Sequence, residues 1–219
     1  MPHSRAENSV TGLLLAGGRS RRMAPAFAGM TGGDKGLLDL AGKPMLAHVI
    51  ERLRPQVGPI VLSANGDLGR FAPFGLPIVP DTIEGSVGPL AGVLAGLRWS
   101  AANAPQARFV ASVSTDAPFL PENLVECLLA GLADGAGSIA LASSAGELHP
   151  VIGLWPVALA DDLEAALRGG VRKVLAFTDQ HGTVAVEFPL QEVRGRAVDP
   201  FFNANTPEEL DEARVLLQI

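Results

Sequence analysis

The sequence predicts an α/β fold built around a mostly parallel sheet. Short apolar runs, which are typical of buried strands, alternate along the chain with longer stretches of helical spacing. Glycine and proline, with 25 and 17 copies, mark the turns between these stretches. Alternation of this kind gives parallel strands that are joined by right-handed crossovers through helices.

Each element is predicted from its own local signal. The expected strands are short apolar runs at residues 10–16, 59–63, 78–79, 109–113, 138–142, 151–155 and 183–188. The expected helices are residues 44–53, 88–100, a segment opened by Pro121, 157–168, 171–177 and a last helix after Thr206. Pro44 takes a first helical position. Thr206, Pro207 and Glu209 form a capping box. Small residues at helical spacing in 88–100 permit close packing against a sheet or a ligand.

Length and composition indicate one packed domain. Of the 219 residues, we assign 1–9 to a polar N-terminal tail and 10–219 to a single domain. A hydrophobic fraction of 47% and a mean hydropathy of +0.27 argue against a disordered chain. Cys127 is the only cysteine, and its helical spacing with Leu124 and Leu128 favours core packing over a catalytic thiol.

The net charge and the lengths of the apolar runs argue against two kinds of binding partner, nucleic acids and membranes. The formal charge of −6 argues against a protein that binds duplex nucleic acid. No apolar run reaches the length of a membrane span, and the polar tail lacks the features of a signal peptide. We therefore expect a cytoplasmic protein without nucleic-acid or membrane contacts, present as a monomer or weak homo-oligomer.

A glycine-rich loop follows the first strand. Because Gly17 and Gly18 come directly after Leu15 and Ala16, bare backbone N–H groups can approach a phosphate or a base edge. Positive charge on such a loop favours the departure of pyrophosphate from a triphosphate. The basic side chains are Arg19, Arg21, Arg22 and, beyond the glycines, Lys35. The loop matches neither the Walker A nor the G-x-G-x-x-G pattern, so by itself it indicates an anion-binding loop or merely a solvated basic one.

Polar residues also follow later strands. In a parallel sheet, ligands bind beyond the carboxyl ends of the strands. This rule selects the loop after Ala16, the turn at residues 80–81 and the segment 114–116. We expect all three places to open on one edge of the sheet.

Four polar residues each have two interpretations. Asp116 can hold Mg²⁺, which needs few carboxylates when a nucleotide supplies further oxygens, or it can cap a turn. Asp81 can accept two N–H groups from the edge of guanine or cap the next segment. Asn65 can contact a ribose or base, or form a turn with Gly66. His149 can contact a second substrate or serve as a structural histidine.

Motifs in a fixed order extend over residues 10–215. The first comprises residues 15–23 (LAGGRSRRM) with Asp34-Lys35, and the closing one is residues 202–210 (FNANTPEEL). Together with the segments between them they resemble the signature of the molybdenum cofactor guanylyltransferases. The intervening matches are residues 42–44, Asp81, residues 88–92, 115–119 and 149–150. The first motif alone indicates the wider nucleotidyltransferase superfamily, and the closing segment narrows it to this branch.

The resemblance implies a three-layer α/β/α sandwich with a Rossmann-like nucleotidyltransferase fold. It implies that GMP passes from GTP to molybdenum–molybdopterin, giving the guanine dinucleotide cofactor and pyrophosphate. Mg²⁺ is the implied cofactor, and molybdenum-insertion or target-enzyme proteins are the implied protein partners. The terminal phosphate of molybdopterin attacks the α-phosphate of GTP in line, without a covalent enzyme intermediate.

The resemblance also implies roles for single residues. Lys35 neutralises phosphate charge, Asp81 reads guanine and Asp116 binds Mg²⁺. The implied nucleotide-binding set is Leu15, Ala16, Gly17, Gly18, Lys35, Asn65, Asp81 and Asp116. The catalytic candidates are Lys35, Asp116 and Arg22. Asn203 and Asn205 are further candidates, and residues 169–173 resemble the stretch near the pterin.

Two departures from the family pattern bear on this interpretation. Residues 24–33 stand where relatives have only a few residues, and they either return Lys35 to its usual place or displace it. We favour the first outcome because lengthening a loop has a modest entropic cost. Ser63 stands where many relatives carry Asn, which leaves one base or ribose contact open.

Two alternatives to the guanylyltransferase function remain. They are a cytidylyltransferase acting on the same pterin and a catalytically weakened GTP-binding accessory protein.

Overall fold

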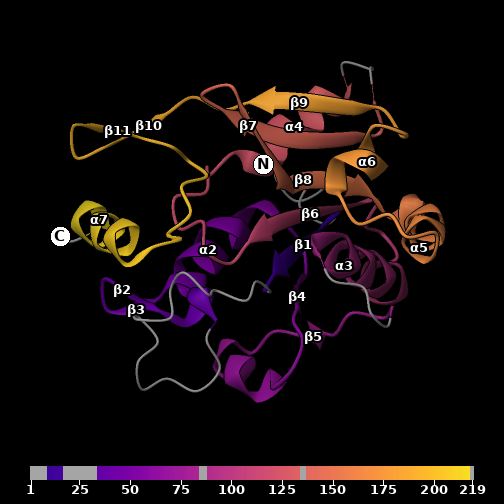
Figure 1. Ribbon diagram of the computed structural model, residues 1–219, viewed down its shortest axis with the longest axis horizontal. Coiled ribbons are helices and arrows are strands. Elements are labelled where there is room, and N and C mark those ends of the chain that lie inside the picture. Colours follow the sequence, from indigo (N-terminus) through magenta and orange to yellow (C-terminus); the bar gives the residue numbers. More distant parts are fainter. Residues whose placement is uncertain (1–8, 17–33, 84–87, 134–136, 218–219) are drawn as a thin grey trace.

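A seven-stranded sheet forms the centre of the computed structural model, which describes residues 9–16, 34–83, 88–133 and 137–217 (Figure 1). The strand order is β5-β4-β1-β6-β8-β7-β9. The strands are β1 (Val10–Leu15), β4 (Ile60–Ser63), β5 (Ile78–Val79), β6 (Phe109–Ser114), β7 (Ile139–Ser144), β8 (Glu147–Pro156) and β9 (Thr183–Glu187). Two two-stranded sheets stand apart: β2 (Asp39–Leu40) with β3 (Lys43–Pro44), and β10 (Gln191–Val193) with β11 (Arg196–Val198).

The central sheet is mostly parallel, which confirms the predicted α/β class. β1 runs parallel to both β4 and β6, and the pairs β4–β5 and β7–β9 are also parallel. β8 is the exception and runs antiparallel to β6 and β7. Ala145 and Gly146 explain this exception, because both have positive φ (49° and 81°) in the tight turn that joins β7 to β8.

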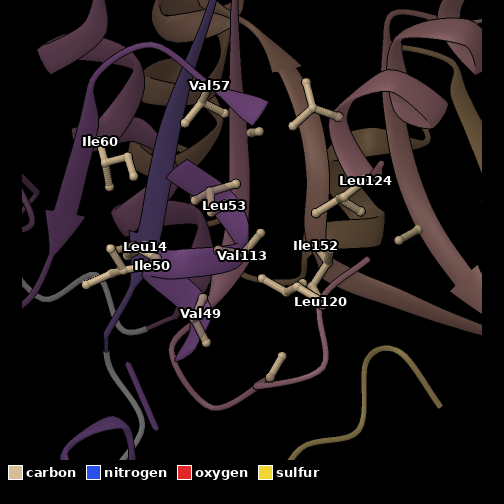
Figure 2. Packing of buried hydrophobic residues seen from close by; sticks show 14 of the residues in the cluster. Leu14, Val49, Ile50, Leu53, Val57, Ile60, Val113, Leu120, Leu124 and Ile152 are labelled. Atoms are coloured by element: carbon tan, nitrogen blue, oxygen red, sulfur yellow. The ribbon is translucent and has the colours of Figure 1, made fainter. Parts of the chain in front are cut away.

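Helices cover both faces of the sheet, so the three layers expected from the resemblance are present. Side chains of β1 alternate between the faces: Leu14 packs with α2 and α4, and Leu13 packs with α3, α5 and α6. Figure 2 shows the first of these cores, where Val49, Ile50 and Leu53 of α2 lie against the sheet.

The helices are α2 (Met45–Leu53), α3 (Pro89–Asn103), α4 (Leu124–Ala133), α5 (Ala160–Arg168), α6 (Val174–Thr178) and α7 (Pro207–Leu217). Short 3₁₀ turns are η2 (Lys35–Leu37), η3 (Arg54–Gln56), η4 (Leu68–Phe74) and η5 (Val157–Leu159). Within the described ranges, no helix is long and apolar enough to cross a membrane.

Several predicted helix starts were wrong. The helix that was expected to open at Pro121 begins at Leu124. Pro44 was expected inside the first helix, but its ψ of 144° is extended; it pairs with Asp39 in a short hairpin and caps α2. Residues 171–173 were expected to be helical, but α6 begins at Val174. The glycine pair at 169–170 ends α5, and Gly170 with a φ of 92° turns the chain away before the next helix can start.

The small residues of α3 pack directly on the sheet. A Cβ atom added at Gly96 would lie 2.5 Å from Leu13 Cδ2, and one added at Gly92 would lie 2.8 Å from Leu15 Cδ2. At these distances an added Cβ atom would force the two leucine side chains to shift. The small-residue face therefore serves close packing against β1, and it fixes the start of α3 near the carboxyl end of that strand.

A third apolar cluster attaches the C-terminal segment to the rest of the fold. Leu210, Ala213 and Leu216 of α7 pack with Leu40 of β2 and with Phe119. Figure 1 shows α7, in yellow, beside the β2–β3 hairpin at one end of the molecule. This docking brings the segment before α7 to the edge of the sheet where β6 ends.

Candidate active site

The carboxyl ends of β1, β4, β5 and β6 lie at one edge of the sheet, as the sequence predicts. Hydrogen bonds hold the chain in register just beyond these strands. Ala16 N donates to Ser63 O at 2.9 Å, and Ala64 N donates to Val79 O at 3.0 Å. Leu15 and Ala16, two residues of the expected nucleotide-binding set, therefore stand directly beside the ends of β4 and β6.

Lys35 lies beside the end of β6 and contacts two residues from distant parts of the chain. Its ammonium Nζ is 2.5 Å from Asp116 Oδ2 and 2.6 Å from Asn205 Oδ1. The side chains of Lys35 and Asp116 are only 17% and 10% exposed, so water and salt weaken the attraction between them less than at the surface. Ser114 Oγ donates to the other carboxylate oxygen of Asp116. Three of the candidates named from the sequence are thus in direct contact.

The backbone around Lys35 is held against the end of β6. Asp34 caps η2, its carboxylate accepting from Gly36 N at 3.1 Å. A Cβ atom added at Gly36 would lie 2.9 Å from Thr115 Cβ, so only glycine lets η2 approach this closely. Burial raises the pKa of Asp34, while its bond from Gly36 and the nearby Arg70 guanidinium act in the opposite direction.

The predicted capping box fixes Asn205 in place. Glu209 Oε2 accepts from the backbone N–H groups of Asn205 at 2.7 Å and Thr206 at 3.0 Å. In return, Glu209 N donates to Thr206 Oγ1 at 3.2 Å. Asn205 Nδ2 donates to Asn203 O at 3.1 Å, which leaves its oxygen facing Lys35.

Asn65 and Asp81 form a second polar group at the same edge. Asn65 Nδ2 donates to Asp81 Oδ2 at 2.8 Å, and Asp81 N donates to Asn65 Oδ1 at 3.0 Å. Burial raises the pKa of Asp81, and the hydrogen bond from Asn65 partly opposes that rise. The sequence left a turn role open for Asn65; with Gly66 at a φ of 77° it does form that turn, and it also holds Asp81.

Arg70 is a site residue that the sequence analysis missed. It lies in η4, between the two groups, and contacts both Asp34 and the backbone of Asn65. No motif includes it, and the segment around it contains Pro73 and gives no helical pattern. The signal available was Asp67, a 3₁₀ N-cap just after a turn, which marks ordered structure there.

His149 has structural partners. Its Nε2 lies 2.7 Å from Ser144 Oγ, and that hydroxyl also lies 2.8 Å from Asp199 Oδ1. Because a hydroxyl has one hydrogen to donate to the carboxylate, the bond with His149 requires an Nε2–H donor. The ring packs at 4.7 Å from the Phe201 ring, and burial lowers the pKa of His149. These contacts tie β8 to the segment that leads to Asn205, as expected of a structural histidine.

Other sequence candidates lie apart or outside the described residues. Gly17, Gly18, Arg22 and the stretch 24–33 fall outside the described residues. The Arg172 guanidinium donates to Leu167 O at 2.7 Å. The backbone carbonyl oxygen of Arg172 lies 3.6 Å from the position of a Cβ atom added at Gly88, which places Arg172 beside the start of α3. Ser63 is buried and faces Gly92, where an added Cβ would lie 2.9 Å from the serine Oγ.

Comparison with known proteins identifies the family. The family model of the MobA-like NTP transferase domain matches residues 12–184. The chain belongs to this family. A relative from Bradyrhizobium sp. (strain ORS 278), named molybdenum cofactor guanylyltransferase, is 50% identical over 214 residues, which is 97% of this chain and 95% of the relative. A relative of the same name from Rhodopseudomonas palustris (strain BisB5) is 49% identical over 92% of this chain and 90% of its own.

A solved structure has the same fold as this chain. The crystal structure of molybdopterin-guanine dinucleotide biosynthesis protein A from Archaeoglobus fulgidus superposes with a TM-score of 0.68. The match covers 94% of this chain and 97% of that chain, at 24% identity. The family resemblance stated from the motifs, and the Rossmann-like nucleotidyltransferase fold that it implied, are both confirmed.

Proposed function

We propose that this chain is a molybdenum cofactor guanylyltransferase, with GTP and molybdenum–molybdopterin as its substrates. Its products are the molybdopterin guanine dinucleotide cofactor and pyrophosphate. The curated relatives that share half of its residues carry this name over nearly the whole chain. We assign the activity to a single domain of residues 10–219.

One observation carries the proposal: three separate family motifs meet at Lys35. Lys35 ends the first motif, and Asp116 belongs to the motif at residues 115–119, just after β6. Asn205 lies in the closing motif, 170 positions along the chain from Lys35. The closing motif distinguishes this branch from other nucleotidyltransferases. A cation and an anion brought together beside Leu15 and Ala16 are what a triphosphate and its metal require.

We assign guanine recognition to the Asn65–Asp81 pair. An ionised carboxylate can accept both the ring N–H and the amino group of guanine, whereas cytosine does not present that pair of donors. The two hydrogen bonds with Asn65 hold the Asp81 side chain and backbone in one orientation. A site built to bind such donors discriminates strongly against a base that lacks them.

We assign the metal site to Asp116. The donor chemistry fits Mg²⁺, which prefers one or two carboxylates together with phosphate oxygens and water. Asp116 already attracts the Lys35 ammonium at 2.5 Å, so its carboxylate faces a cation in this structure, and a metal ion would take the place of that ammonium. Bound there, the ion would supply charge neutralisation at the triphosphate.

The chemistry is an in-line displacement at phosphorus. An oxygen of the molybdopterin phosphate forms a bond to the α-phosphorus of GTP, and the bond from that phosphorus to the oxygen bridging the β-phosphate breaks. The electron pair leaves with pyrophosphate. Lys35 would stabilise the charge that builds on the phosphates, and the remainder of catalysis is positioning.

The deciding experiment incubates the purified protein with Mg²⁺, molybdenum–molybdopterin and one nucleotide at a time. We expect pyrophosphate release and dinucleotide formation with GTP. Consumption of CTP in preference to GTP would make the enzyme a cytidylyltransferase. GTP binding without pyrophosphate release would make it an accessory protein, and either result refutes the proposal.

A further inference from the structure

Arg70 links the two polar groups of the candidate site. Its Nη2 lies 3.5 Å from Asp34 Oδ2, in the residue that precedes Lys35. Its Nη1 donates to Asn65 O at 3.1 Å, in the residue that holds Asp81. One guanidinium therefore touches the loop that carries the phosphate-facing lysine and the turn that carries the guanine-facing pair.

The guanidinium is held rigidly in this bridging position. Nη1 also donates to the carbonyl oxygen of Asp67, and the group lies 4.4 Å from the centre of the Phe71 ring. The Arg70 side chain is only 16% exposed. A planar fork fixed by stacking and several acceptors keeps its geometry, which a flexible lysine ammonium cannot reproduce.

The arrangement leaves one donor of Arg70 unsatisfied. The Nε atom is buried and has no hydrogen-bond partner among the described residues. Buried polar atoms without partners are rare in native proteins, and each is unfavourable. The unsatisfied Nε is therefore a cost of the position of Arg70, in which Nη2 contacts Asp34 and Nη1 donates to Asn65 O.

Each contact of Arg70 continues toward a residue proposed to face the nucleotide. On one side, Asp34 caps η2 through Gly36 N, and Lys35 at the start of η2 reaches Asp116. On the other side, Asn65 holds Asp81 through two hydrogen bonds. The phosphate end and the base end of the site are thus joined through a single side chain.

We propose that Arg70 is a positioning residue that couples guanine recognition to the placement of Lys35. The inference rests on the proposed function, because it names the nucleotide that the coupled residues bind. In this proposal Arg70 contacts neither the base nor the phosphates and acts only through Asp34 and Asn65. Removal of the Arg70 guanidinium breaks its contacts with Asn65 and Asp34 together. The preference for guanine and the turnover number therefore both decline.

The readout is the preference for GTP over ITP, whose base lacks the amino group that Asp81 is proposed to bind. This preference is a ratio of two kcat/KM values from one preparation, so partial inactivation cancels. Asp81→Asn is the reference for lost preference, and Lys35→Met is the reference for lost kcat with the preference kept. We expect Arg70→Met to show both losses, each about tenfold, as for small misplacements of substrate-positioning groups.

Arg98→Met is the matched control. Arg98 is paired with Asp161 at 2.7 Å and Glu164 at 2.6 Å, far from η4 along the chain, and among the described residues none of its ion pairs or hydrogen bonds reaches the candidate site. Its variant loses an arginine and two ion pairs but should keep the wild-type preference and kcat. Arg70→Lys keeps the charge, but a single ammonium cannot span both partners, so it should also lose the preference.

The outcomes separate this inference from the proposed function. An active wild type whose Arg70→Met variant keeps the GTP preference overturns the inference alone. A wild type that forms no pyrophosphate from GTP overturns the proposed function and the inference with it. If Arg70→Met does not fold, Arg70→Lys decides by the same ratio, and failure of both variants to fold makes Arg70 a purely structural residue.

Discussion

The ammonium of Lys35 lies 2.5 Å from Asp116 Oδ2, at the carboxylate that we propose as the metal ligand. Asn205 Oδ1 accepts from the same ammonium at 2.6 Å. Lys35 therefore neutralises Asp116 in this structure, and a cation that binds Asp116 competes with it. Movement of Lys35 from Asp116 toward phosphate oxygens would release the carboxylate for Mg²⁺ when the nucleotide binds.

Competition at Asp116 predicts that Lys35→Met binds Mn²⁺ more tightly than the wild type in the absence of nucleotide. The variant removes the ammonium but keeps an unbranched side chain of similar length. A charge-assisted hydrogen bond contributes about 1.5–3 kcal/mol, so we expect a gain in affinity of about 10- to 100-fold. Titration of free Mn²⁺ by electron paramagnetic resonance measures it.

Lys43→Met provides the control for this gain, because Lys43 forms an exposed ion pair with Glu51 at the surface. It should leave Mn²⁺ affinity unchanged. Equal affinity in Lys35→Met and the wild type would show that Lys35 does not compete for this carboxylate.

Asp116→Asn should nearly abolish turnover while the fold survives. The amide keeps an oxygen for Ser114 Oγ but loses the negative charge that a metal requires. We expect kcat to fall by about 10²–10³-fold, the range seen when one transition-state charge contact is removed. Asp161→Asn, at an exposed position on α5, should retain full activity. Near-normal turnover in Asp116→Asn would remove Asp116 from the metal role.

The preference for GTP over ITP should fall in mild acid because of Asp81. Burial raises the pKa of Asp81 above its ordinary value of 3.8. Above that raised pKa the carboxylate accepts both guanine donors; as the pH falls through it, Asp81 gains a proton and loses acceptor capacity. GTP and ITP carry the same phosphates, so their ratio isolates the base.

Asn65→Ala sharpens the same test. The hydrogen bond from Asn65 lowers the pKa of Asp81, so its removal should shift the loss of preference to higher pH. A preference that stays constant down to the ordinary aspartate pKa, or an unshifted profile in Asn65→Ala, would count against the assignment of Asp81 to guanine.

The sequence predicted the strand ends and the residues on them, because buried strands and phosphate-binding turns have strong local signals. Asp116 was expected at the end of β6, and it lies there against Lys35. The contact between Lys35 and Asn205 depends on the docking of α7, which no local pattern encodes. Arg70 was missed for the same reason: its contact with Asp34 crosses 36 positions, and its short 3₁₀ segment has no periodicity.

Glu209→Ala should destabilise the C-terminal segment. Glu209 Oε2 accepts from two backbone N–H groups, and its loss leaves Asn205 N and Thr206 N without that partner. A lost helix cap costs about 1 kcal/mol, which corresponds to a Tm about 2–4 °C lower for a chain of this size. Glu208→Ala, at the exposed neighbouring position, is the control in thermal denaturation. A Tm that falls equally in both variants would assign the effect to helix charge and not to the cap.

Deletion of residues 24–30 should leave turnover largely intact. The two ends of the loop are anchored independently: Ala16 N bonds to Ser63 O, and Asp34 caps η2 and pairs with Arg70. The deletion shortens the loop by less than half, which changes its closure free energy by less than about 0.6 kcal/mol. Turnover is measured beside a variant in which residues 24–30 become a Gly-Ser segment of equal length. If the deletion is folded and inactive while the Gly-Ser variant is active, loop length is required to bring Lys35 to the triphosphate; if both are inactive, the residues themselves contribute to the site.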